Sequence, residues 1–184
     1  DPAVQKYATA IAGFARAEGS QAVGLAFRQA LGIFESLGLY GVNYVADPKT
    51  PYVERSKSDT EIDTLRFPID TLRGRAGDCD DLSILYAALL ESANIQAAFV
   101  TTPGHIFVAF DLGLDKKSAA DTFSNDADLI YRDDGSVWMP VEVTMVRDGF
   151  QRAWKTGAQE WAAAVSGGKT ETCVNERYAN VSVP

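Results

Sequence analysis

The order of hydrophobic patterns along the chain limits the folds that it can adopt. Two stretches with apolar residues at helical spacing come first, and a leucine stripe and several short segments bounded by turn signals follow. The early helical spacing is carried by Tyr7, Ile11 and Phe14, and then by Phe27, Leu31 and Phe34. We expect two helices there, separated near Glu18-Gly19-Ser20, with Gly38 closing the second.

The strongest helical pattern comes directly after the acidic segment 77–81. Leu82, Leu85 and Leu89 recur with the spacing of one helical face, which predicts a helix from about Cys79 to about Ala93-Asn94.

Short segments with strand-like composition follow this helix. They lie at 96–102, 105–111, 129–132 and 136–143. Pro103-Gly104 and Asp134-Gly135 supply hairpin turns, and a last helix is expected from about Phe150 to Val165. Helices followed by one helix that faces a run of antiparallel strands indicate an α+β fold.

Two regions lack a clear period. In residues 41–75, Asp47-Pro48 and Thr50-Pro51 are turn signals, because the residue before a proline avoids the helical region. We interpret this region as a long surface connection, a type of segment that often carries function. Residues 115–128 are polar and are interpreted as an excursion between the two hairpins.

Composition excludes several classes of protein. The chain has 184 residues and is 46% hydrophobic, which fits one domain with a core of its own. A net charge of −8 without a cluster of Lys and Arg argues against nucleic acid as a partner. No apolar run has the length of a membrane span. The chain begins at Asp1 rather than Met, so we expect a processed form or part of a larger protein.

The pattern of cysteine and histidine residues indicates one kind of chemistry. With Cys79, Cys173 and a single histidine, the chain lacks the spacing of a closed zinc site, and it has no Cys-x-x-Cys redox motif. Cys79 is placed at the start of a helix, where unpaired N–H groups and the helix dipole favour a thiolate and could hold an oxyanion. His105 is the only ordinary candidate for its general base. Cys173 lies in a polar tail and is given no role.

A third residue is expected to orient the histidine. Glu142 lies on the strand that could run beside the His105 strand, and its carboxylate could accept the second imidazole N–H. Asp78 and Asp80 flank the cysteine and oppose negative charge on its sulfur unless they point away. We expect Asp80 or Asp81 to cap the helix.

Three motifs, in this order, resemble the transglutaminase-like superfamily, and most closely its bacterial cysteine-peptidase-like members. They are Gly-Asp-Cys-Asp-Asp-Leu at 77–82, Pro-Gly-His-Ile-Phe-Val at 103–108 and Trp-Met-Pro-Val-Glu-Val-Thr at 138–144. The resemblance covers roughly residues 40–165. Residues 1–184 are therefore interpreted as a single transglutaminase-like domain, with a helical N-terminal extension at 1–39 and a tail at 166–184.

The resemblance implies a papain-like fold with catalytic roles for Cys79, His105 and Glu142. In such a fold the cysteine begins a helix, the histidine lies on a neighbouring strand and the acid on the next. The family commonly has Asp at the third position, and Glu142 departs from this by one methylene. A side chain near the oxyanion is also implied, and Tyr44 or Tyr52 could supply it.

The resemblance also bears on cofactors and location. Some bacterial relatives bind calcium through acids that flank the cysteine, which corresponds to Asp78 and Asp80; no other cofactor is expected. An extracytoplasmic location, periplasmic or secreted, is slightly favoured.

The function predicted from these residues is acyl transfer on carboxamide or peptide bonds, with hydrolysis as the main outcome and a protein or peptide as substrate. One alternative is a transglutaminase that crosslinks proteins, in which an amine replaces water. Another is a non-catalytic protein-interaction domain that keeps the fold. Single residues also have simpler explanations. Trp138 is expected to pack on the core as a strand residue, and Phe150, Trp154 and Trp161 recur at the spacing of one helical face and are expected to pack rather than react.

Overall fold

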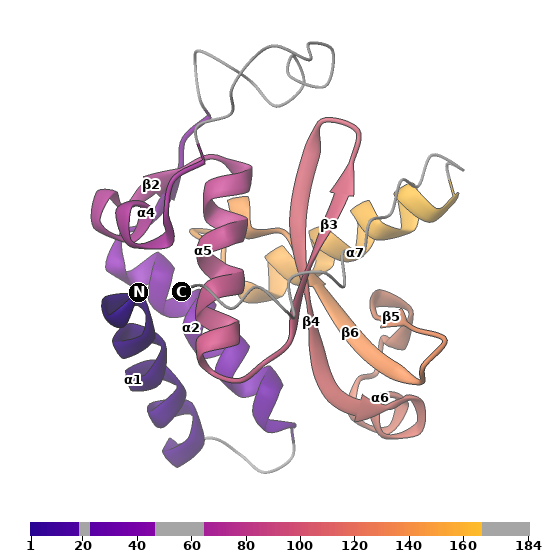
Figure 1. The fold of residues 1–184 in the computed structure, drawn as a ribbon. Coiled ribbons are helices and arrows are strands. Elements are labelled where there is room, and N and C mark those ends of the chain that lie inside the picture. Colours follow the sequence, from indigo (N-terminus) through magenta and orange to yellow (C-terminus); the bar gives the residue numbers. More distant parts are fainter. Residues whose placement is uncertain (19–22, 47–64, 167–184) are drawn as a thin grey trace.

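The computed structural model describes residues 1–18, 23–46 and 65–166 (Figure 1). The first elements are α1 (Pro2–Glu18), α2 (Leu25–Tyr40), β1 (Asn43–Tyr44), α4 (Pro68–Gly74), β2 (Ala76–Gly77) and α5 (Cys79–Ser92). They are followed by β3 (Ala97–Thr102), β4 (His105–Asp115), α6 (Lys116–Thr122), η1 (Asp126–Asp128), β5 (Ile130–Tyr131), β6 (Ser136–Val141), η2 (Val143–Met145) and α7 (Phe150–Ser166).

The strands form two sheets of different kinds. The larger sheet has the order β3-β4-β6-β5 with every neighbouring pair antiparallel, and the smaller one pairs β1 with β2 in parallel. Helices α1 and α2 lie on one side of α5, and the larger sheet lies on its other side (Figure 1). This segregation of helices from an antiparallel sheet agrees with the predicted α+β class.

Helix α5 is the centre of the packing, as its leucine stripe predicts. Leu82, Leu85 and Leu89 are buried, and the hydroxyl of the buried Tyr86 donates to the carbonyl of Ala30 on α2 at 3.0 Å. The main core joins residues from the N-terminal helices, α5, one face of the larger sheet and the first turn of α7. The helices of the N-terminal segment 1–39 therefore contribute directly to the same core as the sheet.

A second, smaller cluster covers the other face of the sheet. It consists of Ala98, Val100, Phe107, Ala109, Ile130 and Trp138, with Trp161 of α7 packed against it. The predicted packing role of Trp138 is confirmed. Phe150 and Trp154 pack on the main core and Trp161 on the smaller cluster, so α7 spans both.

The β4–β6 ladder is regular near one end and irregular near the other. The pairs Val108–Val141, Phe110–Met139 and Asp111–Trp138 share one register. The next pair, Asp115 with Ser136, does not, so the register shifts between Asp111 and Asp115. The shift is a bulge in β4.

Gly38 does not end the second helix, contrary to the prediction. Helix α2 continues to Tyr40, and Gly41 ends it with φ of +96°, donating its N–H to the Gly38 carbonyl. Gly38 instead permits a close approach between elements, because a Cβ there would lie 2.5 Å from the Val146 carbonyl oxygen. Glycine can end a helix and can also allow two elements to approach closely, and its position in the sequence does not tell which of the two applies.

The two regions without a clear period contain more structure than predicted. Within 41–75 the described residues form β1 and α4, and Pro68 stands at the first position of α4, where a missing N–H costs nothing. Within 115–128, α6 begins after Asp115, whose carboxylate accepts from the Ser118 N–H at 2.7 Å. A surface excursion is thus partly a capped helix.

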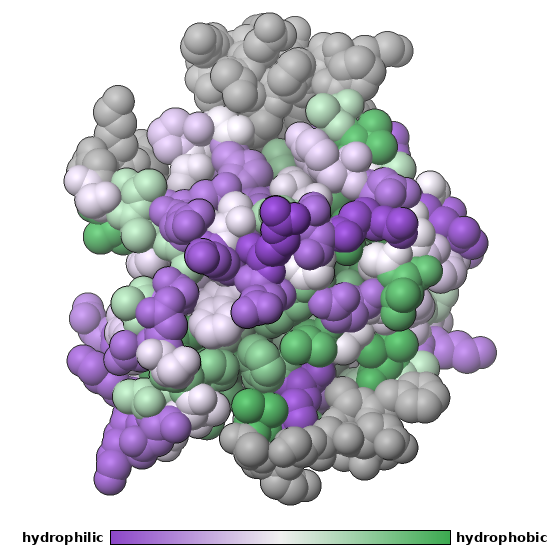
Figure 2. Space-filling view, turned by 180° about the vertical axis from the view of Figure 1, so that it is seen from behind, coloured by the Kyte–Doolittle hydropathy of each residue, from purple (hydrophilic) through white to green (hydrophobic). Residues whose placement is uncertain are grey.

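None of the helices in the described ranges combines the length and the hydropathy that a bilayer crossing requires. On the side of the molecule opposite to that in Figure 1, hydrophilic residues form a broad band across the middle (Figure 2).

Candidate active site

Helix α5 begins at Cys79, as predicted, but the residue that caps it is Asp78. The Asp78 carboxylate accepts from the backbone N–H of Asp81 at 3.3 Å, and the expectation that Asp80 or Asp81 would serve as the cap is wrong. Cys79 takes the first helical position and is 7% exposed. Its sulfur therefore lies where the backbone N–H groups of the first turn favour negative charge.

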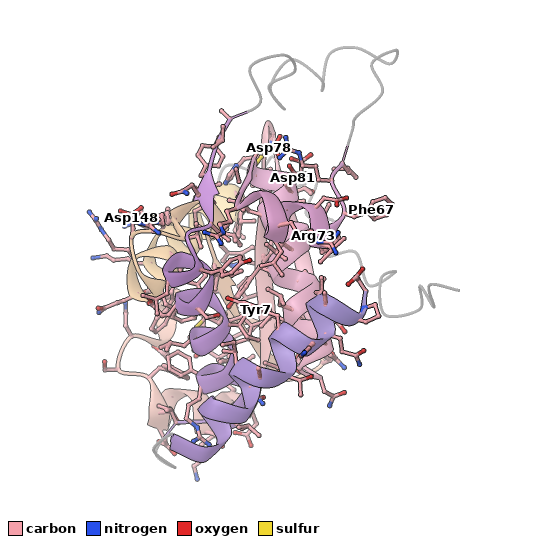
Figure 3. The ribbon with its side chains drawn as sticks, turned by 90° about the vertical axis from the view of Figure 1, so that its left-hand side faces the viewer. Tyr7, Phe67, Arg73, Asp78, Asp81 and Asp148 are labelled. Carbon is pink, nitrogen blue, oxygen red and sulfur yellow. The ribbon has the colours of Figure 1, made fainter. Side chains whose placement is uncertain are left out.

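The acids beside Cys79 have partners away from the sulfur. Asp81 accepts from the Arg66 N–H at 2.9 Å and forms an ion pair with the Arg66 side chain at 3.6 Å. Burial raises the pKa of Asp81, and the hydrogen bond from Arg66 acts against that rise. Asp78 and Asp81 lie side by side at the N-terminal end of α5 (Figure 3). The cost of negative charge next to the cysteine is thus partly offset by helix N–H groups and by Arg66.

His105 is the first residue of β4, directly after the turn at Gly104, which has φ of +80°. Its ring stacks on the buried Phe107 with centroids 6.3 Å apart. Helix α5 packs against β4, and the Ser83 hydroxyl donates to the Ile106 carbonyl at 3.5 Å. These contacts bring the imidazole to the start of α5, where it is hydrogen bonded to Cys79.

Glu142 follows the last residue of β6. It was expected on the strand itself, yet β6 ends at Val141, and Glu142 caps the short helix η2 by accepting from the Thr144 N–H at 2.9 Å. Because Val141 pairs with Val108, the next residue lies alongside the first part of β4. Glu142 Oε2 is 2.5 Å from His105 Nε2, and the side chain is 3% exposed. An exposed strand position is therefore excluded.

The imidazole has two hydrogen-bonded neighbours, which together favour its charged form. Hydrogen bonds to Cys79 and then Glu142 raise the pKa of His105 from 6.5 to about 10, although burial acts to lower it. Burial acts to raise the pKa of Glu142, but hydrogen bonds from His105 and Thr144 outweigh it and the pKa is lowered. With Nε2 facing Glu142, Nδ1 is the nitrogen available to the thiol.

Tyr44 also reaches this site. Strand β1 pairs with β2 so that Tyr44 lies opposite Gly77, two positions before Cys79. Burial, followed by negative charge at Cys79 and Asp78, raises the pKa of Tyr44. Tyr52, the other residue suggested for an oxyanion contact, lies outside the described residues, and so does Cys173.

Glu160 is a member of the site that the sequence analysis missed. It lies on α7, and its Oε2 is 3.6 Å from His105 Nε2. The only sequence signal was its place next to Trp161, because the interpretation of α7 followed the aromatic residues alone.

Two groups of side chains in the described ranges have donor atoms within 4.8 Å of one another, close enough to share a metal ion. In the group of His105, Glu142 and Glu160, the imidazole and Glu142 already share a 2.5 Å hydrogen bond, and we assign no ion to it. The other group consists of Asp78, Asp80 and Asp81, at the position expected for calcium. Since Asp81 is paired with Arg66 and Asp78 caps α5, this cluster does not require an ion, and calcium binding stays a prediction.

Comparison of the chain with protein-family models, with curated proteins and with solved structures gave no match.

Proposed function

We propose that the chain is a transglutaminase-like cysteine enzyme that hydrolyses carboxamide or peptide bonds. The observation that carries this proposal is that one imidazole, that of His105, is hydrogen bonded to Cys79 and to Glu142. A nucleophile, a base and a group that orients the base are the three parts that covalent acyl transfer requires.

The reaction follows from these positions. The Cys79 sulfur attacks the carbonyl carbon, while its proton resides on His105. His105 then donates that proton to the leaving nitrogen as the carbon–nitrogen bond breaks, which gives an acyl-enzyme and a free amine. Water, deprotonated by His105, attacks the acyl carbon and releases the acid, and the proton returns to Cys79.

The hydrogen bond to Cys79 gives His105 different properties in the two halves of the reaction. It is the largest contribution to the raised pKa of His105. Acylation of the sulfur removes the thiolate from this contact, so the imidazole becomes less basic in the acyl-enzyme. It then exists in the neutral form that a base for water needs.

The oxyanion of the tetrahedral intermediate has two candidate donors. One is the set of backbone N–H groups in the first turn of α5, which begins at Cys79 and where such groups have no acceptor within the helix. Tyr44 could supply a hydroxyl from β1, which is fixed to β2 by a hydrogen bond from the Val45 N–H to the Gly77 carbonyl at 2.9 Å. We propose Tyr44 for the role that was left open between Tyr44 and Tyr52.

The arrangement of elements supports a papain-like fold within the α+β class. The cysteine begins a helix that packs against an antiparallel sheet, the histidine begins one strand, and the acid follows the neighbouring strand. Hydrolysis is favoured over amine transfer because water needs no second binding site. The intact triad argues against a purely non-catalytic domain.

Alkylation by iodoacetamide at about pH 6 tests the thiolate. We expect Cys79 to react about 10²-fold faster than N-acetylcysteine, because a free thiol is mostly protonated at that pH. The advantage should disappear in His105→Ala. Peptide mass spectrometry assigns the modified residue, and a Cys79 no faster than the free thiol would sink the enzyme proposal.

Turnover is tested separately with a peptide library that contains amine acceptors. Wild type should give hydrolysed peptides, Cys79→Ser none, and amine-linked products would show the transglutaminase alternative instead.

Calcium binding is tested by calorimetric titration of the protein with calcium. The titration should give heat that Asp80→Ala abolishes, and a titration without heat ends that part of the proposal.

A further inference from the structure

Helix α7 docks on the strand that leads to Glu142 with an unusually close contact. A Cβ on Gly157 would lie 2.9 Å from the Val141 nitrogen and 3.1 Å from the Glu142 nitrogen. The Glu142 N–H donates to the Ala153 carbonyl of the same helix at 3.0 Å. Glu160 comes one turn after Gly157, so this docking carries its side chain to the same end of β6.

The Glu160 carboxylate is inserted between other groups of the site. Its Oε2 atom is buried and has no hydrogen-bond donor among the described residues, while His105 Nε2 lies 3.6 Å away. The carboxylates of Glu142 and Glu160 approach each other within 4.8 Å. Two ionised carboxylates this close repel each other even beside the imidazole of His105, and a proton on one of them relieves that repulsion.

Glu142 has the capacity to accept a hydrogen bond from a protonated Glu160. Its Oε1 accepts from the Thr144 N–H and hydroxyl, and its Oε2 accepts from His105. Each carboxylate oxygen has two lone pairs, so a further hydrogen bond at Oε2 is possible.

The titratable groups around Glu160 favour its protonated form. They are Glu142 at the end of β6 and His105 on β4, and Cys79 on α5 lies beyond the imidazole. Burial and then the neighbouring Glu142 raise the pKa of Glu160 from 4.5 to about 7, while His105 acts to lower it.

We propose that Glu160 is a positioning residue that, when protonated, donates a hydrogen bond to Glu142 and keeps that carboxylate ionised and directed at His105. The consequence for catalysis rests on the proposed function. The hydrogen bond between Glu160 and Glu142 does not depend on that function. When Glu160 ionises, the bond to Glu142 becomes a repulsion, and two anions face the imidazolium. His105 then holds its proton more firmly and donates it less readily to a leaving amine.

The test uses the single histidine of the chain. Nitrogen-15 labelling of histidine in the untagged protein gives one pair of ring signals, and their shifts distinguish imidazolium from neutral imidazole. Hydrogen bonds to Cys79 and Glu142 raise the pKa of His105 to about 10, so an inflection near pH 7 that leaves the imidazolium signals in place reports a neighbouring group. We expect that inflection in wild type and its loss in Glu160→Gln, whose amide donates at every pH. Glu91→Gln is the matched control, because Glu91 accepts from the Ala97 N–H away from this site and its change should leave the inflection in place.

The outcomes separate the two proposals. An imidazolium without any inflection between about pH 5 and pH 8 overturns the role of Glu160 and leaves the triad intact. An inflection that persists in Glu160→Gln and accompanies loss of the imidazolium overturns both, because His105 then titrates as an ordinary histidine.

Discussion

Carboxylates gather in two places around Cys79 and His105, and their partners differ. At the start of α5, Asp78 serves the helix backbone and Asp81 pairs with Arg66. Around the imidazole, Glu142 pairs with His105, and the Glu160 carboxylate lies 3.6 Å from the same ring nitrogen. The first group is neutralised within its own surroundings, whereas the charge of the second acts on His105. Residue type alone therefore does not reveal which acids affect the chemistry.

The largest expected difference between the two groups is in thiol reactivity. Glu142→Gln removes the anion that faces the imidazole, so the pKa of His105 should fall from about 10. We expect iodoacetamide to modify Cys79 roughly tenfold more slowly at about pH 6, since each pKa unit is a factor of ten. Asp81→Asn is the matched change in the other group and should alter the rate far less. Equal effects of the two variants would contradict the comparison.

A change at Gly157 should disturb the imidazole group through packing alone. Gly157→Ala forces α7 away from β6, and we expect a loss of about 1–3 kcal/mol in the free energy of unfolding by urea. Gly13→Ala is the control, because a Cβ there meets nothing within 4 Å on the exposed face of α1. It should stabilise the protein by about 0.5–1 kcal/mol. A stabilising Gly157→Ala would show that the close docking is not required.

A change at Asp78 isolates the helix-start group. Asp78→Ala removes the cap of α5 and should cost about 1 kcal/mol of unfolding free energy, whereas Asp78→Asn retains an accepting oxygen and should cost little. Urea unfolding of both variants measures the difference. If both lost the same stability, the charge of Asp78 rather than its cap would matter.

The pH dependence of stability should also follow the imidazole group. The pKa of His105 is raised from 6.5 to about 10, so its stabilisation is complete below pH 6.5 and is lost as pH rises through 10. Glu160 has the same sign, because its pKa is raised from 4.5 to about 7 and its protonated form is favoured in the fold. The free energy of unfolding should be lower at about pH 9 than at about pH 6, with a smaller difference in His105→Gln. An unchanged difference in that variant would assign the dependence to other groups.

The closeness of Cys79, His105 and Glu142 could be predicted from sequence because its signals are local. The leucine stripe predicts that α5 begins near Cys79, and the Pro-Gly turn predicts that β4 begins at His105. Glu160 and the cap at Asp78 were missed for different reasons. The position of Glu160 depends on how α7 docks on β6 through Gly157, a tertiary contact without a periodic signal. Three neighbouring aspartates could cap α5, and the sequence pattern does not distinguish among them.

The bulge between Asp111 and Asp115 divides the β4–β6 ladder into two parts with different tolerance for change. The regular part fixes the phase of the ladder from Phe110 to Val108 towards the site, and the extra residues of β4 are absorbed beyond it, around Gly113. A residue added on the far side would shift the remote end of the ladder and leave the pairing of Val108 with Val141 in place. The turn at Gly135, which leads from β5 into β6 beyond this bulge, is therefore a suitable attachment point for a fluorophore or a grafted peptide.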